Sequence, residues 1–168
     1  MPAGLKATSS LITISAGVTE SAPNTFTQQQ VDLQLNPLDN EVFVVYAVDL
    51  DILEPNLVAG TDTAIRGSLT TTTKTGVSGI SSSSCIAANR ISIQEEGGAY
   101  VRGAYASDSA PAANLDYLAI IATNDFFLQI EGSNNALARA MNARLYGVRM
   151  RADSSVYAAL VQSEMLSQ

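Results

Sequence analysis

The acidic pair Asp49 and Asp51 is the first feature of this sequence that could do chemistry. Residues two apart on an extended strand point to the same side, so both carboxylates could share a hard cation such as calcium. Glu54 and Asp62 follow downstream, but the spacing does not fit the twelve-residue calcium loop with its central glycine. The pair is a weak calcium candidate, and a solvated strand end is the commoner origin of such a cluster.

Catalysis has two further candidates, Cys85 and the adjacent acids Glu95 and Glu96. A nucleophilic cysteine needs a nearby base that lowers its pKa, and the chain has no histidine, so we expect Cys85 to be a small buried residue. Glu95 and Glu96 could join Asp49 and Asp51 in a hydrolase that uses a carboxylate pair, although a strand end before a glycine turn also explains them. The sequence predicts a protein that is not an enzyme and needs no cofactor or metal.

The charges are distributed unevenly along the chain. Residues 1–62 hold eight acids and one base, whereas residues 139–151 hold four arginines and no acid. One interpretation is phosphate contact with nucleic acid, and another is an arginine face of one copy that meets an acidic face of the next copy. The net negative charge of the chain favours the second interpretation. A third interpretation is that these arginines simply face solvent. The interface candidates are Arg139, Arg144, Arg149 and Arg151 with Asp49, Asp51 and Glu54.

The composition restricts function and compartment. The 168 residues carry a formal net charge of -7, one cysteine and only 15% charged residues, which is less than the roughly 25% of an average soluble domain. A low-charge surface rich in small polar residues suggests that much of it meets other protein. Since no secretory signal pattern and no membrane-spanning run is visible, we expect synthesis in the cytosol and a free Cys85 thiol.

The elements that must position these residues are mostly strands. Apolar and polar residues alternate around Val31, Leu33 and Leu35, and similar patterns recur at spacings that predict about nine strands. A hairpin is expected across Asn124-Asp125, joining strands at 115–123 and 126–131. In the strand 143–151, either Leu145 points inward or Tyr146, Val148 and Met150 do, and the second register leaves Arg149 and Arg151 outside.

The order of these elements predicts the fold class. No alternation of strands and helices is visible, which argues against a parallel sheet. We expect an all-β, antiparallel β-sandwich, jelly-roll-like, with an extended N-terminal arm at 1–24 that contains one edge strand. The domain at 25–168 would end in a short amphipathic helix at 154–166, capped near Asp153 and apolar at Val156, Tyr157, Leu160, Val161 and Met165.

This pattern resembles a small single jelly-roll viral capsid protein. The resemblance rests on the Ser/Thr/Ala-rich arm, the core strands between Thr25 and Arg151, the long small-residue loops and the low charge, and the stretch 149–164 is phage-like. Small RNA-virus coats usually carry a basic arm, which this chain lacks. That departure resembles shells of DNA viruses of bacteria or archaea, and makes nucleic acid an improbable primary partner.

Two functions follow as expectations. The resemblance implies a structural virion protein, a capsid subunit that assembles in the host cytoplasm with copies of itself and with other virion proteins. The alternative is a bacteriophage decoration protein or a receptor- or carbohydrate-binding module. Such a module would need an exposed aromatic platform, for which Tyr100 and Tyr105 are the loop-flanking pair.

Overall fold

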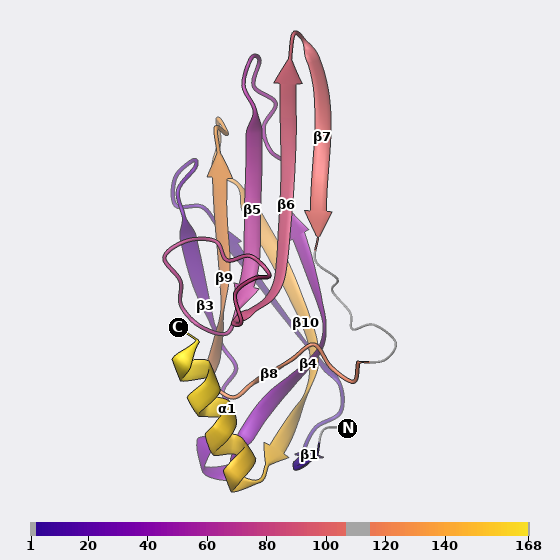
Figure 1. The fold of residues 1–168 in the computed structure, drawn as a ribbon, viewed down its shortest axis with the longest axis vertical. Helices are drawn as coiled ribbons and strands as arrows, with labels where there is room; N and C mark the ends of the chain where they lie inside the picture. The colour runs from indigo at the N-terminus through magenta and orange to yellow at the C-terminus, as the bar shows by residue number, and fades with distance from the viewer. Residues whose placement is uncertain (1–2, 107–114, 168) are drawn as a thin grey trace.

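The computed structural model describes residues 3–106 and 115–167, which form two antiparallel five-stranded sheets and one C-terminal helix (Figure 1). Sheet A contains β1 (Leu5–Ala7), β2 (Ile12–Thr19), β4 (Glu41–Ile52), β8 (Ala119–Ile121) and β10 (Ala140–Ala152). Sheet B contains β3 (Thr27–Asp32), β5 (Thr63–Thr70), β6 (Cys85–Glu96), β7 (Ala99–Ala106) and β9 (Asp125–Ser133). The predicted all-β sandwich is confirmed.

The strand order is that of a jelly roll. Sheet A runs β2-β10-β4-β8 and sheet B runs β3-β9-β5-β6, so the chain crosses repeatedly between the sheets. Two strands extend this set of eight. β1 continues the line of β2 along β10, and β7 is added to the outer side of β6. The N-terminal stretch expected as an arm thus supplies two strands, both paired with β10.

The main core lies between the sheets, and a second core lies outside sheet A. Phe43, Val45 and Leu145 of sheet A pack with Ile65 and Leu128 of sheet B. On the outer side of sheet A, a smaller cluster is covered by α1 (Ser154–Leu166). β4 therefore has both faces buried in its first half, as its continuous apolar sequence predicts.

A bulge in β4 reverses the alternation of its side chains. The register with β10 shifts between Tyr146 and Gly147, and Tyr46 is the extra residue. Before the bulge, Val44 faces α1; after it, Val48 faces sheet B, and the odd-numbered acids point outward. The bulge thus divides the outer face of sheet A into an apolar half under the helix and a polar half.

The predicted hairpin across Asn124-Asp125 is wrong. β8 pairs with β4 in sheet A, whereas β9 pairs with β3 and β5 in sheet B, so residues 122–124 cross between the sheets. The buried carboxylate of Glu164 on α1 accepts hydrogen bonds from the backbone N–H groups of Ala122 (3.0 Å) and Thr123 (2.8 Å). Ten strands are present in the described residues rather than about nine.

The helix has the predicted bounds, Ser154–Leu166. Val156, Tyr157, Leu160 and Val161 pack against sheet A as expected. Met165 does not, because 63% of its surface is exposed. The helix is therefore held by one apolar stripe and by the Glu164 carboxylate.

Candidate functional site

The polar half of the outer face of sheet A carries the acids that the sequence singled out. Two rows cross the strands: Ser15, Arg144 and Asp49 share one, and Gly17, Asn142 and Asp51 share the next. All of these residues except Gly17 border an open groove of about 660 Å³, together with Ala16 and Ala143. Asp49 and Asp51 point to the same side, as their spacing predicts, and both are exposed.

Two carboxylates, those of Asp49 and Asp51, face this groove. Calcium takes six to eight oxygens, usually from several carboxylates. No cluster of three or more acids, cysteines or histidines able to hold a metal occurs in residues 3–106 and 115–167. Arg144 stands opposite Asp49, and a hydrogen bond with Tyr146 and the charge of Asp49 raise the pKa of Arg144, so the groove already holds a cation. The arrangement suits contact with another polar surface.

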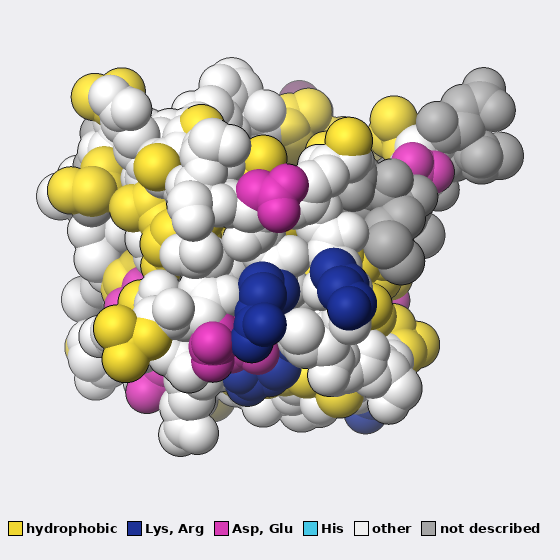
Figure 2. Space-filling view, turned by 90° about the horizontal axis from the view of Figure 1, so that it is seen from below, with side chains coloured by type: hydrophobic (Ala, Val, Ile, Leu, Met, Phe, Trp, Pro, Cys, Tyr) yellow, Lys and Arg dark blue, Asp and Glu magenta, His cyan; other side chains and the backbone are white. Residues whose placement is uncertain are grey.

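The four arginines of residues 139–151 do not form one basic surface. Arg144 lies on the outer face of β10, whereas Arg149 and Arg151 have the opposite parity and Arg139 directly precedes the strand. Arg151 pairs with Asp39 at 3.1 Å, and both side chains are more than half exposed. Seen from below in Figure 2, basic and acidic side chains lie next to one another. The two signs of charge are mixed here.

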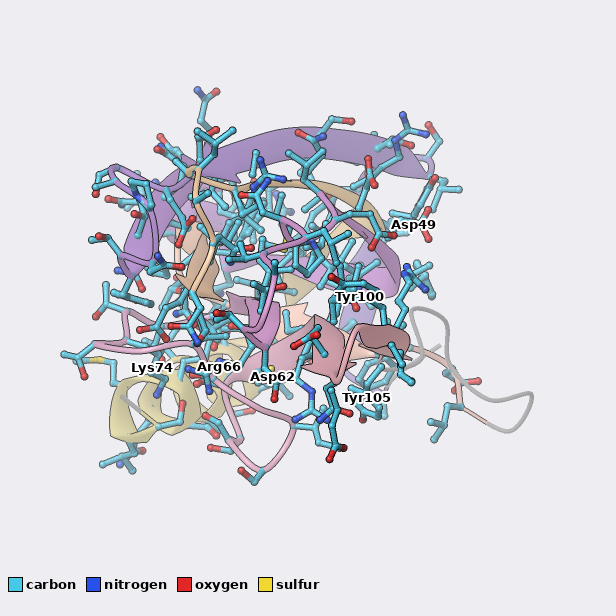
Figure 3. The ribbon with its side chains drawn as sticks, turned by 90° about the horizontal axis from the view of Figure 1, so that it is seen from above. Asp49, Asp62, Arg66, Lys74, Tyr100 and Tyr105 are labelled. Atoms are coloured by element: carbon cyan, nitrogen blue, oxygen red, sulfur yellow. The ribbon has the colours of Figure 1, made fainter. Side chains whose placement is uncertain are left out.

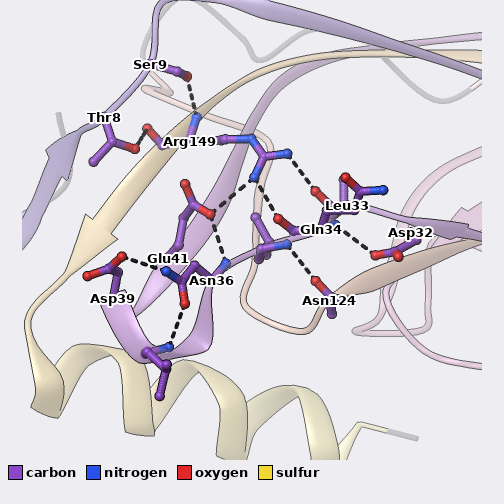
Figure 4. A network of polar contacts seen from close by, with 12 residues as sticks. Thr8, Ser9, Asp32, Leu33, Gln34, Asn36, Asp39, Glu41, Asn124 and Arg149 are labelled. Atoms are coloured by element: carbon purple, nitrogen blue, oxygen red, sulfur yellow. Dashed lines mark hydrogen bonds and ion pairs between the residues drawn. The ribbon is translucent and has the colours of Figure 1, made fainter.

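Arg149 connects the two sheets near the helix (Figure 4). Its guanidinium donates to the carbonyl oxygens of Leu33 (2.6 Å) and Gln34 (3.0 Å) and pairs with Glu41 at 3.2 Å. The two charged side chains are largely buried, with 27% and 17% exposed. Since its donors are used within the chain, Arg149 holds the end of β3 against sheet A and is not free for a partner.

Arg139 and the buried acid Glu20 form a second internal tie. The Glu20 carboxylate is 4% exposed and accepts hydrogen bonds from the N–H groups of Gly132 (2.6 Å) and Arg139 (2.8 Å). The Arg139 guanidinium donates to the carbonyl oxygen of Glu54 at 2.7 Å. The sequence gives no sign that Glu20 is buried, because this acid stands among small polar residues.

Glu54 is separated from Asp49 and Asp51. Its carboxylate binds Arg102 of β7 with Nη2–Oε1 at 2.6 Å, and Nε lies 3.0 and 3.1 Å from the two oxygens. The hydrogen bond with Arg102 lowers the pKa of Glu54, and both side chains remain more than half exposed. This ion pair ties the loop after β4 to the edge of sheet B.

The four acids proposed for a hydrolase do not meet. Asp49 and Asp51 face away from sheet B, while Glu95 and Glu96 lie at the end of β6 in sheet B and, as neighbours, point to opposite faces. Glu95 accepts a hydrogen bond from the N–H of Gly98 at 2.8 Å, which stabilises the turn. The two pairs are therefore too far apart in the fold to act on one substrate bond.

Cys85 is a half-buried thiol at the start of β6. Burial raises its pKa, and the hydrogen bond to the carbonyl oxygen of Ala87 at 3.4 Å does not offset this. A raised pKa leaves the thiol protonated, which is the opposite of what a nucleophile needs.

Tyr100 and Tyr105 do not form a common aromatic platform. Tyr100 pairs with Glu95 and Tyr105 with Arg90, and these two β6 positions point to opposite faces of sheet B. Figure 3 shows the two tyrosines on opposite sides of the ribbon. A flat sugar-binding surface would need both rings on one face.

An open groove of about 380 Å³ lies on the outer face of sheet B. Arg66, Arg90 and Tyr105 stand in one row across three strands, and the loop containing Val77 and Ile80 forms the other wall. Arg66 is paired with Glu131 of the next strand at 2.7 Å. Arg90 makes no ion pair with any acid in the described part of the chain, and the groove is lined by two arginines.

The free edge of sheet B is the most unusual surface. All eight residues of β7 are exposed, and Tyr100, Val101 and Tyr105 expose 46%, 63% and 45% of their surfaces. Within residues 3–106 and 115–167, β6 is the only strand paired with β7. An exposed apolar edge strand is a template for pairing with another chain.

The described residues thus offer a polar groove on sheet A, a positively charged groove on sheet B and an open strand edge. No helix among them is long and apolar enough to cross a membrane. No protein-family model matches the chain, and no curated protein matches it.

Proposed function

We propose that the chain is a structural virion protein, a capsid subunit that assembles with copies of itself. The observation that carries this proposal is the edge strand β7, which is exposed along its whole length and carries exposed apolar side chains at Tyr100, Val101 and Tyr105. Proteins that remain monomeric usually protect such an edge with charges, prolines or a covering loop. An edge left open in this way favours assembly.

The jelly-roll strand order supports the same proposal. This double-sheet architecture occurs in viral capsid proteins, and also in lectin domains and cupins, so the fold alone does not decide the function. β7 lies outside the eight strands of the jelly roll and contributes no buried residue. A strand that adds little to the core of its own chain is well placed to serve a neighbouring chain.

A subunit that assembles needs surfaces for several neighbours. The polar groove of Ser15, Asp49, Asp51, Asn142 and Arg144 offers acids, an arginine and an amide on one face. Such mixed polar surfaces form wet interfaces, in which hydrogen bonds and bridging water hold the partners. We place the second contact of the subunit here.

The experiment is to purify the chain and measure its mass by light scattering while particles are sought by electron microscopy. We expect ordered oligomers or shells that appear as the concentration increases. A strictly monomeric chain at high concentration and in varied buffers would contradict the proposal. Detection of the chain at high copy number in purified virions would test the location directly.

The second candidate is a phage decoration protein or a receptor- or carbohydrate-binding module. The groove beside Arg66, Arg90 and Tyr105 favours it, because one aromatic ring lines an open hollow with two arginines, and Arg90 makes no ion pair within residues 3–106 and 115–167. Binding of acidic glycans that disappears in Tyr105→Ala, with no assembly of the chain, would support this candidate over the first. A glycan array without hits would remove its carbohydrate-binding form.

A further inference from the structure

Strand β7 has the features of an edge strand whose open side can pair with a further strand. Its residues are exposed on both faces, and its three large apolar side chains leave about half of their surface in contact with solvent. The strand is eight residues long, and no described strand covers its outer side. Pairing with another strand would bury both its side chains and its backbone groups.

The charge of β7 does not protect the edge. Arg102 is its only charged residue, and this guanidinium is already bound to Glu54 on two nitrogens. Edge strands commonly avoid association through an unpaired lysine or an inward-pointing charge. The neutralised Arg102 gives β7 little of this protection.

The turn before β7 shows which of its backbone groups are free. Gly97 and Gly98 have φ values of 60° and 85°, as in a two-residue type I′ hairpin, whose closing pair is Glu96 and Ala99. In such a hairpin, the closing pair and every second pair exchange hydrogen bonds. The strand positions that direct N–H and C=O groups outward are Tyr100, Arg102, Ala104 and Ala106.

We propose that β7 pairs antiparallel with β7 of a second copy, about a two-fold axis that passes through Gly103. In this register Tyr100 lies opposite the second copy's Ala106, and Arg102 lies opposite Ala104, so the outward backbone groups meet in hydrogen-bonded pairs. Val101 lies opposite Tyr105 in the closer, non-hydrogen-bonded pairs. A β-branched residue beside an aromatic ring is a favourable cross-strand pair, and it occurs twice.

Sequence and symmetry select this register over its neighbours. A two-fold axis perpendicular to the sheet keeps each face on its own side, so the residue numbers of opposed positions must sum to an even number. Shifting the axis to Arg102 would place the two arginines opposite each other, which is destabilising. Axes at Val101 or Ala104 shorten the overlap to five residues. The axis at Gly103 keeps seven residues paired and meets no like charge.

The pairing would join two copies of sheet B into one continuous ten-stranded sheet. This inference rests on the proposed function, because it names the contact through which two subunits join. It also commits to one occupant of the edge, a second copy of the same strand.

The test is a cysteine at the two-fold axis. In a Cys85→Ser background, Gly103→Cys places two thiols on opposed Cα atoms about 4.5 Å apart, which a disulfide can span. A Cβ at Gly103 would meet the Oγ of Ser92 at 3.1 Å, and this hydroxyl can rotate away. Under a glutathione redox buffer, we expect Gly103→Cys to shift from monomer to disulfide dimer on a non-reducing gel.

Two matched variants fix the register. Val101→Cys would lie opposite Tyr105 and should stay uncross-linked, whereas Arg102→Cys would cross-link if the axis lay at residue 102. Cross-linking of Arg102→Cys in preference to Gly103→Cys would overturn the proposed register.

The outcomes separate this inference from the proposed function. Oligomers that form while Gly103→Cys remains uncross-linked would overturn the β7 contact and leave assembly through another surface standing. A monomeric chain with no cross-link in any variant would contradict both. Cross-linking together with oligomers of even copy number is the result expected if both hold.

Discussion

The two edges of sheet B, β3 and β7, differ in what their side chains do. β3 is rich in glutamine, and its side chains are bound within the chain: Gln28 accepts from the N–H of Lys74 (2.9 Å) and from Gln129 (3.1 Å), and Gln30 donates to Asp125. β7 carries three exposed apolar side chains, and within the described residues its one side-chain ion pair is Arg102–Glu54. Each of the two strands has one strand partner among the described residues, so the edges differ in their side chains: those of β3 are bound by the chain itself, whereas those of β7 are left exposed.

The extension of β3 is bound as firmly as the strand itself. Leu33 and Leu35 donate their N–H groups to the carbonyl and side-chain oxygens of Asn124, at 2.7 Å and 2.6 Å. Arg149 holds the carbonyl of Leu33 from the other sheet. Every one of these contacts stabilises the folded chain, so β3 belongs to folding, whereas the exposed length of β7 is available for association.

The largest expected effect comes from a charge on the open edge. Val101→Glu would place a carboxylate opposite Tyr105 twice in the proposed pair, and desolvating it there should return the assembly to monomer. Because Val101 is exposed in the free chain, the free energy of unfolding should change by only about 0.5 kcal/mol. Light scattering and chemical denaturation measure the two quantities.

The matched control adds the same charge to the other edge. Gln29 is exposed on β3, so Gln29→Glu should leave the oligomeric mass unchanged. A compensating pair, Val101→Lys with Tyr105→Glu, would place opposite charges across the two-fold axis and should restore the assembly. Loss of assembly in Gln29→Glu but not in Val101→Glu would assign the contact to β3 instead.

The next effect concerns the stability of the closed edge. Gln129 is fully buried on β9 and bonds with Ser68 (2.8 Å), Thr70 (2.9 Å) and Gln28. Gln129→Ala leaves these buried partners unsatisfied and should lower the free energy of unfolding by roughly 2–3 kcal/mol. Its denaturation midpoint should fall, while Gln29→Ala on the exposed side of the same edge should change little. An unchanged midpoint would mean that water replaces the amide without cost.

The sequence predicts where the strands lie better than it predicts which strands pair with one another. The alternation correctly indicates that Leu33 and Leu35 are buried and Val31 is half-buried, and the continuous apolar run of β4 indicates its burial, because burial depends on local period. The error at Asn124-Asp125 has a different origin. Both residues suit a tight turn, but the flanking segments bury their apolar sides in different sheets, and no local pattern encodes which sheet a strand joins.

The candidate site also has some features that the sequence predicts and others that it does not. The spacing of Asp49 and Asp51 correctly places both acids on one face, although a bulge at Tyr46 decides which face that is. The separation of Arg144 from Arg149 follows from strand parity and was predictable. Gln129 also gives a signal, since it is the one polar residue in the run 126–130, but Glu20 gives none because its partners are backbone groups of distant residues.

A smaller, pH-dependent effect probes the crossover that holds the end of β3. Burial raises the pKa of Glu164, the hydrogen bonds from Ala122 and Thr123 oppose this, and the charge of Asp125 adds to it. A carboxyl whose folded pKa is raised stabilises the fold below the unfolded value of 4.5, and this contribution is lost as the pH rises through the folded pKa.

The corresponding variant is Glu164→Gln, which cannot ionise. As the pH rises from about 4 to 8, the native chain should lose stability relative to this variant, as measured by urea denaturation across the range. If the native chain instead became more stable relative to the variant as the pH rises, the two hydrogen bonds would outweigh the effect of burial on the pKa of Glu164.

The smallest expected effect tests the only charge on the open edge. The bond with Arg102 lowers the pKa of Glu54, so this pair stabilises the fold above the unfolded value of 4.5, and the contribution is lost as the pH falls through the lowered pKa. Both side chains are more than half exposed, so Glu54→Gln should barely change the denaturation midpoint at neutral pH.

The effect of Glu54→Gln should instead fall on association, because an Arg102 without its carboxylate carries a free charge on β7. Assembly of Glu54→Gln should therefore weaken and respond more strongly to salt than that of the native chain, as followed by light scattering at two ionic strengths. Unchanged salt dependence would place Arg102 outside the contact and limit the comparison between the two edges to their apolar side chains.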